Sequence, residues 1–384
     1  MADGARRYGN GQIELTNRAN FQIRGITPPD EDALIQHLLD AGLGPKDAQA
    51  DDIRNVMVSA TLGLDSTAIV DVSDLAAQIL AFVEGDERIH ALSPKLSILV
   101  DGGEVGSPAD HPSDLWLSAM ADGLFAFGYA SRPPMSDQDP APLGAIHADH
   151  AFDLVVASLE AFVALTLKNP SIKRFRDADA LALAALVSGR VPVSPAPKDW
   201  RRARPDRLAQ IGLIPQNQAC NLAVGGVSVL GRVTPDCLTS LADLALTANG
   251  GAFRLTPWSG VLITDVAAAD GPKILAGLMA LGFTVDRDAP LAQMVACSGT
   301  SGCASALAPT KEDALRLAGL LTGAVDVHLT ACPKSCASAR VADVTLVAVD
   351  ADHYDLYRRQ DGLDGFGQKH NQGLILAQTA EVLA

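Results

Sequence analysis

Four cysteines in the last quarter of the chain have a spacing that suits an iron–sulfur cluster. Five residues separate Cys297 from Cys303, and after 28 further residues Cys332 and Cys336 follow with three between them. Both pairs lie in segments rich in Gly, Ser, Thr and Pro, whose small side chains let a backbone wrap closely around a bulky group. A [4Fe-4S] cluster requires four converging thiolates. We therefore predict that these four cysteines bind one.

Other interpretations of the quartet stay open at this point. Structural zinc sites also use four thiolates, but about two to four residues usually separate their paired cysteines. Disulfides are disfavoured, because we recognise no signal peptide and cytosolic thiols stay reduced. The cysteines could also be unrelated core residues. Cys220 and Cys237 stand apart in apolar or helical contexts, and we predict that they are small core residues.

Size and composition indicate a globular protein of two or three domains. The chain has 384 residues, of which 48% are hydrophobic, enough for substantial cores. A formal net charge of −15 and an aromatic content of 4% argue against nucleic-acid binding, which needs phosphate-neutralising cations and stacking side chains. We see no apolar run near the roughly 18 residues that span a bilayer. We therefore expect a cytoplasmic protein without a membrane partner.

The chain also resembles itself. A displacement of 240 residues relates residues 12–23 to 252–263, Thr16 to Thr256, Gly42 to Gly282 and residues 54–59 to 294–299. A displacement of 239 relates Pro94-Lys95 to Pro333-Lys334. A register that survives this distance without gaps indicates a duplicated unit. Chance similarity between two alternating strands is the alternative.

Hydrophobic periodicity and capping residues predict the elements that position these motifs. We expect strands over 12–26, 222–230, 252–263, 325–331 and 343–349, the last closing the domain, and helices over 30–41, 234–247, 271–281 and 311–322. Residues 222–281 then have the order of a ferredoxin-like half. The first copy lacks the matching strand and most of the helix. We expect the true start of the protein to lie upstream, and the alternative is that this copy has decayed.

The cysteine spacing, in a chain duplicated around such strands, resembles the sulfite and nitrite reductase superfamily. In that superfamily the four cysteines hold a [4Fe-4S] cluster, and the last, here Cys336, bridges it to a sirohaem iron. Residues 15–25 resemble the segment that contacts the tetrapyrrole, with Arg18 at its basic position. Arg54 resembles a second basic position, and Lys95 lies in a segment similar to the lysine loop that faces the substrate.

The resemblance implies an α+β fold with a duplicated sulfite/nitrite reductase-like architecture. We expect a first ferredoxin-like half over 1–45, a first nitrite/sulfite reductase-like domain over 46–186, a Pro- and Arg-rich linker over 187–207, a second ferredoxin-like half over 208–290 and a [4Fe-4S] cluster domain over 291–384.

Within the superfamily, residues 96–103 and 253–258 are most similar to the precorrin-3B synthase branch. Ser97 stands where the lysine loop of the reductases has a second lysine. Six-electron reduction of sulfite or nitrite needs several cations around a small oxyanion, so this difference weakens the reductase interpretation. Ser259 departs from the branch, in which we expect an arginine after the tryptophan.

That branch implies O2-dependent hydroxylation and lactone formation on precorrin-3A in aerobic cobalamin biosynthesis. Arg18, Arg54, Lys95 and Lys334 would then bind the carboxylates of a precorrin-type tetrapyrrole, since cations suit such groups. We find no convincing nicotinamide-binding glycine motif after a strand, and expect an external electron donor, either NADH through a reductase or ferredoxin. The alternatives are a sirohaem-dependent sulfite or nitrite reductase and a non-enzymatic iron–sulfur or zinc structural protein.

The resemblance also implies a mononuclear non-haem iron that activates O2. His147 and His150 form the only close His/Asp grouping and are candidate ligands, although polar residues at the start of a helix are the simpler interpretation. For His328, on the strand that enters the second cysteine pair, we expect a supporting or structural role. The sequence names no catalytic base.

Overall fold

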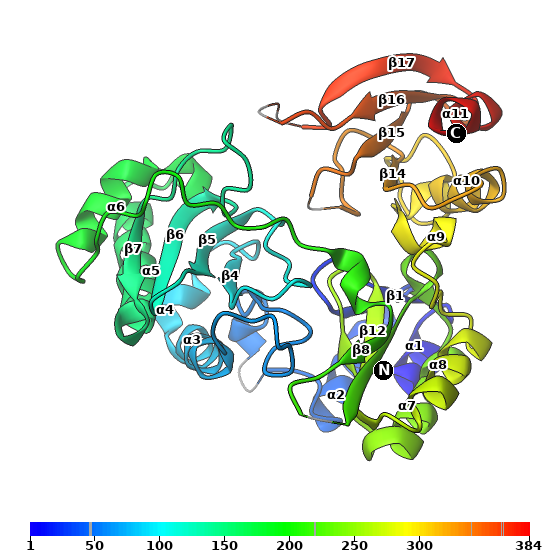
Figure 1. Ribbon diagram of the computed structural model, residues 1–384, viewed down its shortest axis with the longest axis horizontal. Helices are drawn as coiled ribbons and strands as arrows, with labels where there is room; N and C mark the ends of the chain where they lie inside the picture. Colours follow the sequence, from blue (N-terminus) through cyan, green and yellow to red (C-terminus); the bar gives the residue numbers. More distant parts are fainter. Residues whose placement is uncertain (46–47, 219, 339, 362, 364) are drawn as a thin grey trace. The chain divides into compact units, whose positions relative to one another are not determined.

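The computed structural model describes residues 1–45, 48–218, 220–338, 340–361, 363 and 365–384. It comprises two compact units, and Figure 1 labels many of their helices and strands. Unit 1 contains Met1–Glu31 and Leu208–Ala384, and unit 2 contains Asp32–Arg207. Both units combine helices with mostly antiparallel or mixed sheets, which confirms the predicted α+β class.

Unit 2 is built on a five-stranded sheet of order β3-β4-β5-β6-β7. The pairs β3–β4 and β4–β5 are parallel, and the pairs β5–β6 and β6–β7 are antiparallel. Its elements are α2 (Glu31–Asp40), β3 (Val56–Met57), α3 (Ser73–Gly85), α4 (Glu87–His90), β4 (Ile98–Asp101), β5 (Ser113–Ala119), β6 (Leu124–Ser131), β7 (Gly144–His147), α5 (Ala151–Lys168) and α6 (Ala180–Ser188).

The central strand of this sheet is covered on both faces. All seven residues of β5 are buried, as expected for a strand between two apolar layers. One layer includes α3 and α5, where Phe162 stacks on Phe175 with ring centroids 4.0 Å apart. Trp116 packs in the other layer and donates its indole N–H to the Ser131 hydroxyl at 2.9 Å.

Unit 1 contains a second sheet with the same plan, of order β13-β14-β15-β16-β17. Its first three strands are again parallel and its last two pairs antiparallel. The elements are α9 (Pro290–Gln293), β13 (Met294–Ala296), α10 (Thr310–Ala318), β14 (Val327–Thr330), β15 (Val344–Ala348), β16 (Tyr354–Arg358), β17 (Gln368–Leu374) and α11 (Leu376–Leu383). A helix follows the first strand and another follows the last in both copies, which confirms a duplicated architecture.

The remaining elements of unit 1 form two smaller sheets, of order β11-β12-β9-β8 and β10-β1-β2. They are α1 (Ala2–Tyr8), β1 (Ile13–Leu15), β2 (Phe21–Ile23), β8 (Gly212–Pro215), β9 (Asn221–Val227), β10 (Arg232–Val233), α7 (Pro235–Asn249), β11 (Arg254–Leu255), β12 (Gly260–Ala267) and α8 (Gly271–Ala280). Strand β1 pairs with β10, so a strand of the first copy joins a strand from the middle of the chain.

Residues 240 positions apart form corresponding strand pairs and corresponding backbone hydrogen bonds. Glu14 pairs with Gln22, and Arg254 pairs with Leu262. The Thr16 N–H bonds the Asn20 carbonyl, just as the Thr256 N–H bonds the Gly260 carbonyl. Helices α2 and α8 also begin and end at positions 240 apart. The weak sequence similarity therefore reflects a repeated structure.

Two expected strands are hairpins. Residues 12–26 form β1 and β2, and residues 252–263 belong to β11 and β12, each pair joined by a tight turn. Ala19 and Ser259 occupy corresponding turn positions with φ of 54° and 59°. A backbone in this left-handed region cannot continue an extended strand. Because apolar residues continue to alternate with polar ones through the turns, the sequence pattern did not reveal the turns.

Three further expectations near the C-terminus were wrong. The helix predicted over 311–322 ends at Ala318, because Gly319 follows it as the cap. The strand predicted over 343–349 does not close the domain, since β16 and β17 continue the sheet. Lys95 precedes β4 whereas Lys334 follows β14, so the two lysine positions are not equivalent in the repeat.

One helical stretch among the described residues, Ala148–Lys168, is long and apolar enough to cross a bilayer by length and composition alone. This differs from our expectation that no apolar run would approach that length. Its residues Leu154, Leu159 and Phe162 are buried in the core of unit 2. A core helix passes the same test.

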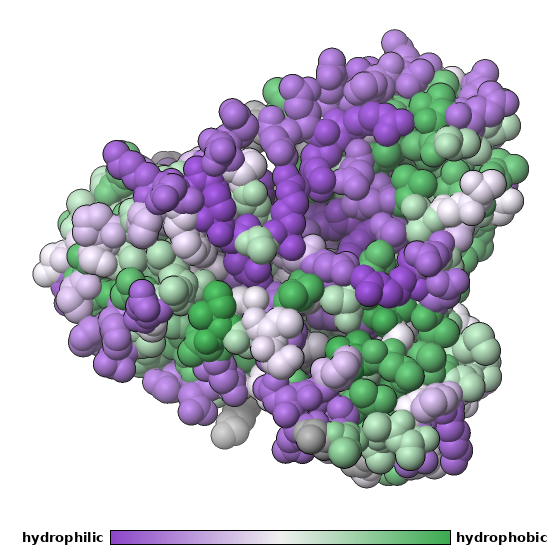
Figure 2. Space-filling model, in the orientation of Figure 1, coloured by the Kyte–Doolittle hydropathy of each residue, from purple (hydrophilic) through white to green (hydrophobic). Residues whose placement is uncertain are grey.

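Apolar side chains gather over α7 and α8 on the face shown in Figure 2. Leu246 and Met279 on these helices are 60% and 61% exposed, while Leu241 and Leu278 are buried. Both helices are therefore amphipathic, and some of their apolar residues remain on the outer face, as is common on protein surfaces.

Gly225 in β9 provides a test of the close packing of this strand against Gln210 and Leu262. A methyl group at this position would overlap the carbonyl oxygen of Gln210 and lie 2.7 Å from a methyl of Leu262. We expect Gly225→Ala to lower the free energy of unfolding by about 3 kcal/mol, because a backbone carbonyl cannot move aside cheaply. Gly323→Ala, where a methyl meets nothing within 4 Å, is the matched control. Equal urea midpoints for the two variants would contradict the packing described.

Candidate functional site

The two cysteine pairs follow neighbouring parallel strands. Met294 and Ala296 of β13 lie beside Val327 and Leu329 of β14. The carboxyl ends of parallel neighbours meet at the same edge of a sheet, so Cys297 and the segment that holds Cys332 emerge side by side. We call residues 297–309 the first cysteine loop and residues 331–338 the second. The Leu307 N–H of the first donates to the Ala331 carbonyl of the second at 3.1 Å.

Cys297 lies where the two loops meet. Its sulfur accepts a hydrogen bond from the Ala331 N–H at 3.2 Å and lies 3.3 Å from the Thr310 hydroxyl. Hydrogen bonds to sulfur stabilise negative charge on it and are one of the ways in which proteins tune iron–sulfur clusters. The surroundings of Cys297 therefore suit a metal-bound thiolate.

Exposure differs among the other three cysteines. Cys332 is partly buried, Cys303 and Cys336 are exposed, and all four are free thiols. In the described part of the chain, no three His, Cys, Asp or Glu side chains are grouped closely enough to hold a metal ion. The structure thus brings the two loops together without gathering their sulfurs. The donor types and the positions of the two loops fit a [4Fe-4S] cluster.

The two copies of the sheet differ at this edge. The loop after β4 corresponds to the second cysteine loop and carries Gly102, Gly103 and Glu104 instead of thiols. The first cysteine in the chain is Cys220, so no thiolate chemistry is available in unit 2. The candidate cluster site thus belongs to one copy of the repeat only.

The four predicted substrate-binding residues divide equally between the units. In unit 1, Arg18 is exposed in the turn between β1 and β2, and Lys334 lies in the second cysteine loop with its ammonium 3.5 Å from the Ser305 hydroxyl of the first. In unit 2, Lys95 is exposed, and Arg54 forms ion pairs with Asp51 at 3.3 Å and Glu84 at 3.5 Å.

Ser97 is part of a buried polar network in unit 2. Its backbone N–H and its hydroxyl both donate to a carboxylate oxygen of Asp114, at 3.0 and 3.2 Å. Arg174 holds the same carboxylate at 2.8 Å. Position 97 thus carries a buried neutral hydroxyl fixed against an anion, and it supplies no cation to a substrate.

Sequence reasoning missed a group of charged residues in unit 1, which we call the Glu14 cluster: Glu14, Arg24, Arg232 and Lys311. Burial opposes the charge of Glu14, but Lys311, Arg24 and Arg232 outweigh that effect and lower the pKa of its carboxyl. Burial lowers the pKa of the Lys311 ammonium, which Glu14 partly offsets. A signal did exist, because Glu14 stands between Ile13 and Leu15 in a strand that is buried throughout.

Glu104 is a second charged group that the sequence did not single out. It is 1% exposed, and neither carboxylate oxygen has a hydrogen-bond partner on another residue in the described part of the chain. Burial, with repulsion from Asp101 and Asp65, raises its pKa to about 7. Arg202 lies close by but bonds the Asp101 carboxylate and the Glu104 backbone carbonyl. With a pKa of about 7, Glu104 gains and loses its proton near neutral pH.

The histidines do not form a metal site among the described residues. His147 and His150 are about half exposed, and each contacts its own aspartate, Asp149 and Asp153, at 3.2 Å. No third ligand joins them. His328 is buried in β14, where burial lowers its pKa to about 4 and keeps it neutral.

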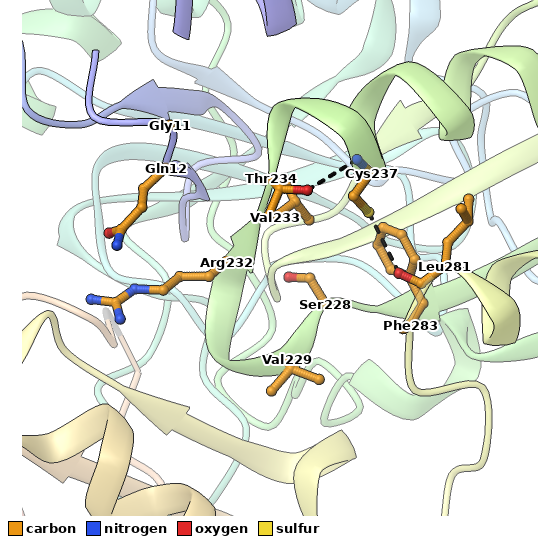
Figure 3. A pocket seen from close by; sticks show the side chains of 11 residues that line it. Gly11, Gln12, Ser228, Val229, Arg232, Val233, Thr234, Cys237, Leu281 and Phe283 are labelled. Carbon is orange, nitrogen blue, oxygen red and sulfur yellow. Dashed lines mark hydrogen bonds between the residues drawn. The ribbon is translucent and has the colours of Figure 1, made fainter. Parts of the chain in front are cut away.

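The two cysteines outside the quartet differ from our expectation of small core residues. Cys220 is exposed, with φ of 72°, and Cys237 is half-buried in the first turn of α7. Cys237 lines a cavity of about 350 Å³ in unit 1. Figure 3 shows its sulfur directed at the Leu281 carbonyl, while Arg232 extends away from Cys237 and Phe283.

Comparison with protein families finds two matches. Residues 1–41 and 214–281 match the nitrite/sulfite reductase ferredoxin-like half domain, and residues 49–177 match the nitrite and sulphite reductase 4Fe-4S domain. The second segment contains none of the cysteines, which lie in the other copy of the sheet. The ferredoxin-like match is split in the sequence because the first copy of the sheet is inserted between its parts.

Relatives include both reductases and a synthase. The ferredoxin–nitrite reductase of Synechococcus elongatus is 30% identical, over 90% of this chain and 72% of its own length. The chloroplastic enzyme of Oryza sativa is 29% identical, over 90% of this chain but only 62% of its own length. A precorrin-3B synthase from Sinorhizobium is 26% identical, over 92% of this chain and 74% of its own length. The chain thus spans roughly two-thirds of the length of these relatives.

A solved structure has the same fold. The NirA protein of Mycobacterium tuberculosis superposes with a TM-score of 0.77 at 19% identity, covering all of this chain and 76% of its own. This likeness supports the duplicated architecture described above.

The raised pKa of Glu104 predicts a pH-dependent stability. Between its usual pKa of 4.5 and about 7, the unfolded chain loses the proton while the folded protein keeps it. Relative to Glu104→Gln, the wild type should therefore lose stability as the pH rises through this window, by at most about 3 kcal/mol. Urea midpoints at pH 4.5 and pH 8 measure the effect, with the exposed Glu87→Gln as control. A constant difference between wild type and Glu104→Gln would contradict it.

Proposed function

Because the chain belongs to the nitrite and sulfite reductase family, we propose that it is an oxidoreductase of the precorrin-3B synthase type. In this proposal one atom of O2 hydroxylates the substrate precorrin-3A, and the other atom leaves as water after taking up two protons and two electrons from a separate donor. The hydroxylated product closes to a lactone, as a step of cobalamin biosynthesis. The protein would act in the cytoplasm. The Sinorhizobium relative supports this choice among the activities of the family.

The observation that carries the proposal is the environment of Ser97. Reduction of a small oxyanion concentrates negative charge at one point, so it needs several cations directed there. At position 97 the chain has a hydroxyl that is 6% exposed and bound to the Asp114 carboxylate. A lysine at this position would have to displace a buried ion pair. The loop is thus better suited to a large substrate, whose carboxylates are spread widely.

The residues of the chain have distinct roles in this proposal. Cys297, Cys303, Cys332 and Cys336 would hold the [4Fe-4S] cluster, which supplies one-electron transfer when bound. Arg18, Arg54, Lys95 and Lys334 would bind the substrate carboxylates by charge-assisted hydrogen bonds. The electrons would come from a separate donor such as ferredoxin, the donor in the names of several relatives.

A sirohaem-dependent nitrite reductase is the second candidate. The relative from Synechococcus favours it, since it is 30% identical over 90% of the chain. Lys95 retains the first cation of the lysine loop and is exposed. Under this proposal, Cys336 would bridge the cluster to sirohaem.

The first experiment is to purify the protein without oxygen and to measure iron, sulfide and extractable sirohaem. About four irons and four sulfides without sirohaem, followed by O2-dependent turnover of precorrin-3A, is the expected result. Stoichiometric sirohaem together with nitrite reduction would replace the first candidate by the second. Absence of iron and sulfide after anaerobic reconstitution would reject both.

Cysteine variants test the ligand assignment in the same preparation. Serine at Cys297, Cys303, Cys332 or Cys336 should remove most of the iron and sulfide, because a serine hydroxyl is a poor ligand for this cluster. Cys220→Ser is the control, since Cys220 is a free thiol that is exposed, like Cys303 and Cys336, and remote from the quartet in sequence. If Cys303→Ser kept a full cluster, the quartet would be wrong.

Arg54 tests the binding of the substrate. Loss of a charge-assisted hydrogen bond costs roughly 1.5–3 kcal/mol, so Arg54→Ala should raise the Kd for a precorrin-type tetrapyrrole at least about tenfold. Arg88→Ala is the control in the same unit, because Arg88 also pairs with two carboxylates but is more exposed. Fluorescence or absorption titration gives the Kd. An unchanged value would remove Arg54 from the site.

A further inference from the structure

The Glu14 cluster has one carboxylate surrounded by three cations. The Arg24 guanidinium donates to Glu14 Oε2 through Nε at 3.0 Å and through a terminal nitrogen at 2.5 Å. Arg232 lies 3.4 Å and Lys311 3.7 Å from Glu14 Oε1. These residues come from β1, the end of β2, β10 and α10, so only the folded unit 1 assembles them.

The two central members are shielded from water. Glu14 is 8% exposed and Lys311 is 6% exposed. The Lys311 ammonium also donates to the Leu230 backbone carbonyl, which fixes its position. The Glu14 cluster contains three cations and one carboxylate, so two of its positive charges are not neutralised within it. Charges in such a site act over longer distances than charges in water, because the effective dielectric constant is lower.

The cations of the group face the first cysteine loop. Arg24 lies 3.4 Å from the Ser298 hydroxyl and Arg232 lies 3.3 Å from the Ser301 hydroxyl. Both serines lie between Cys297 and Cys303. Lys311 is the residue after Thr310, whose hydroxyl contacts the Cys297 sulfur. The group therefore contacts the loop that carries half of the proposed ligands.

We propose that the Glu14 cluster sets the reduction potential of the iron–sulfur cluster held by the four cysteines. Reduction adds one electron to a centre bound by four thiolates, so nearby positive charge favours the reduced form. Lys311 thus raises the potential, and Glu14 moderates that effect by neutralising part of the positive charge. Lys311 and Glu14 are positioning residues, because neither binds the iron–sulfur centre and both act on it through the electric field of their charges. This inference rests on the proposed function, because it requires the [4Fe-4S] cluster on the four cysteines.

Two charge-removing variants have opposite expected effects. Lys311→Met removes a positive charge and should lower the midpoint potential. Glu14→Gln removes the negative charge and should raise it. We expect each to change the reduction equilibrium by about tenfold, which is 59 mV for a one-electron couple. Potentials come from dithionite titration of the anaerobic protein, followed by electron paramagnetic resonance.

Opposite signs distinguish a field effect from a loss of structure. If the group only held the loop in place, both variants would disturb the cluster in the same way. Shifts of the same sign, or shifts no larger than that of the control, would overturn the proposal. The control is Arg316→Met, which removes a positive charge from the same helix at a side chain that is 65% exposed. Water screens such a charge, so its effect should be small.

A further variant covers the case in which Lys311→Met fails to retain iron. Lys311→Arg keeps the charge, so it should keep about four irons and sulfides per chain. Loss of the cluster in both variants would show that packing rather than charge matters at position 311, and would overturn the proposal. A wild-type protein that binds no cluster would instead reject the proposed function, so the two failures are distinguishable.

Discussion

The parallel pairing of β13 with β14 is the constraint on which the candidate site depends. It places the first residue after β13, Cys297, beside the segment that leads to Cys332, and it lets the Ala331 N–H reach the Cys297 sulfur. Parallel neighbours require a crossover connection, and here that connection contains the first cysteine loop and α10. The helix in turn places Lys311 beside Glu14. The two cysteine loops and the charges that face the first of them thus follow from one strand pairing.

The two copies of the sheet share a structure but differ in the chemistry of their loops. Both copies of the sheet have the same order and the same mixture of parallel and antiparallel pairs. Their loops differ, since the edge that carries thiols in one copy carries Glu104 in the other. Residues inside the strands are constrained by packing on both faces, whereas loop residues at the carboxyl ends are free to change. The same plan can therefore carry two cysteine loops in one unit and a buried carboxyl with a raised pKa in the other.

Several features were predictable because they depend on short-range patterns. The cysteine spacing, the helices over 30–41 and 271–281, and the displacement of 240 residues all follow from neighbouring residues or from direct comparison of segments. The turns at Ala19 and Ser259 were not predictable, because neither alanine nor serine favours a left-handed backbone. The strand order was also hidden, since β1 pairs with β10 across more than half of the chain. Such contacts depend on the packing of the whole unit.

The sequence by itself determined the kind of chemistry available, because four thiols at suitable spacings, cationic side chains at Arg18 and Lys95, and a hydroxyl at Ser97 are properties of the residues themselves. Only the tertiary structure decided how charge is distributed around them. A chain with a net charge of −15 nevertheless places three cations around Glu14 beside the first cysteine loop. It also buries Ser97 against Asp114. Electrostatic effects depend on distance and burial, and both arise only when remote segments are folded together.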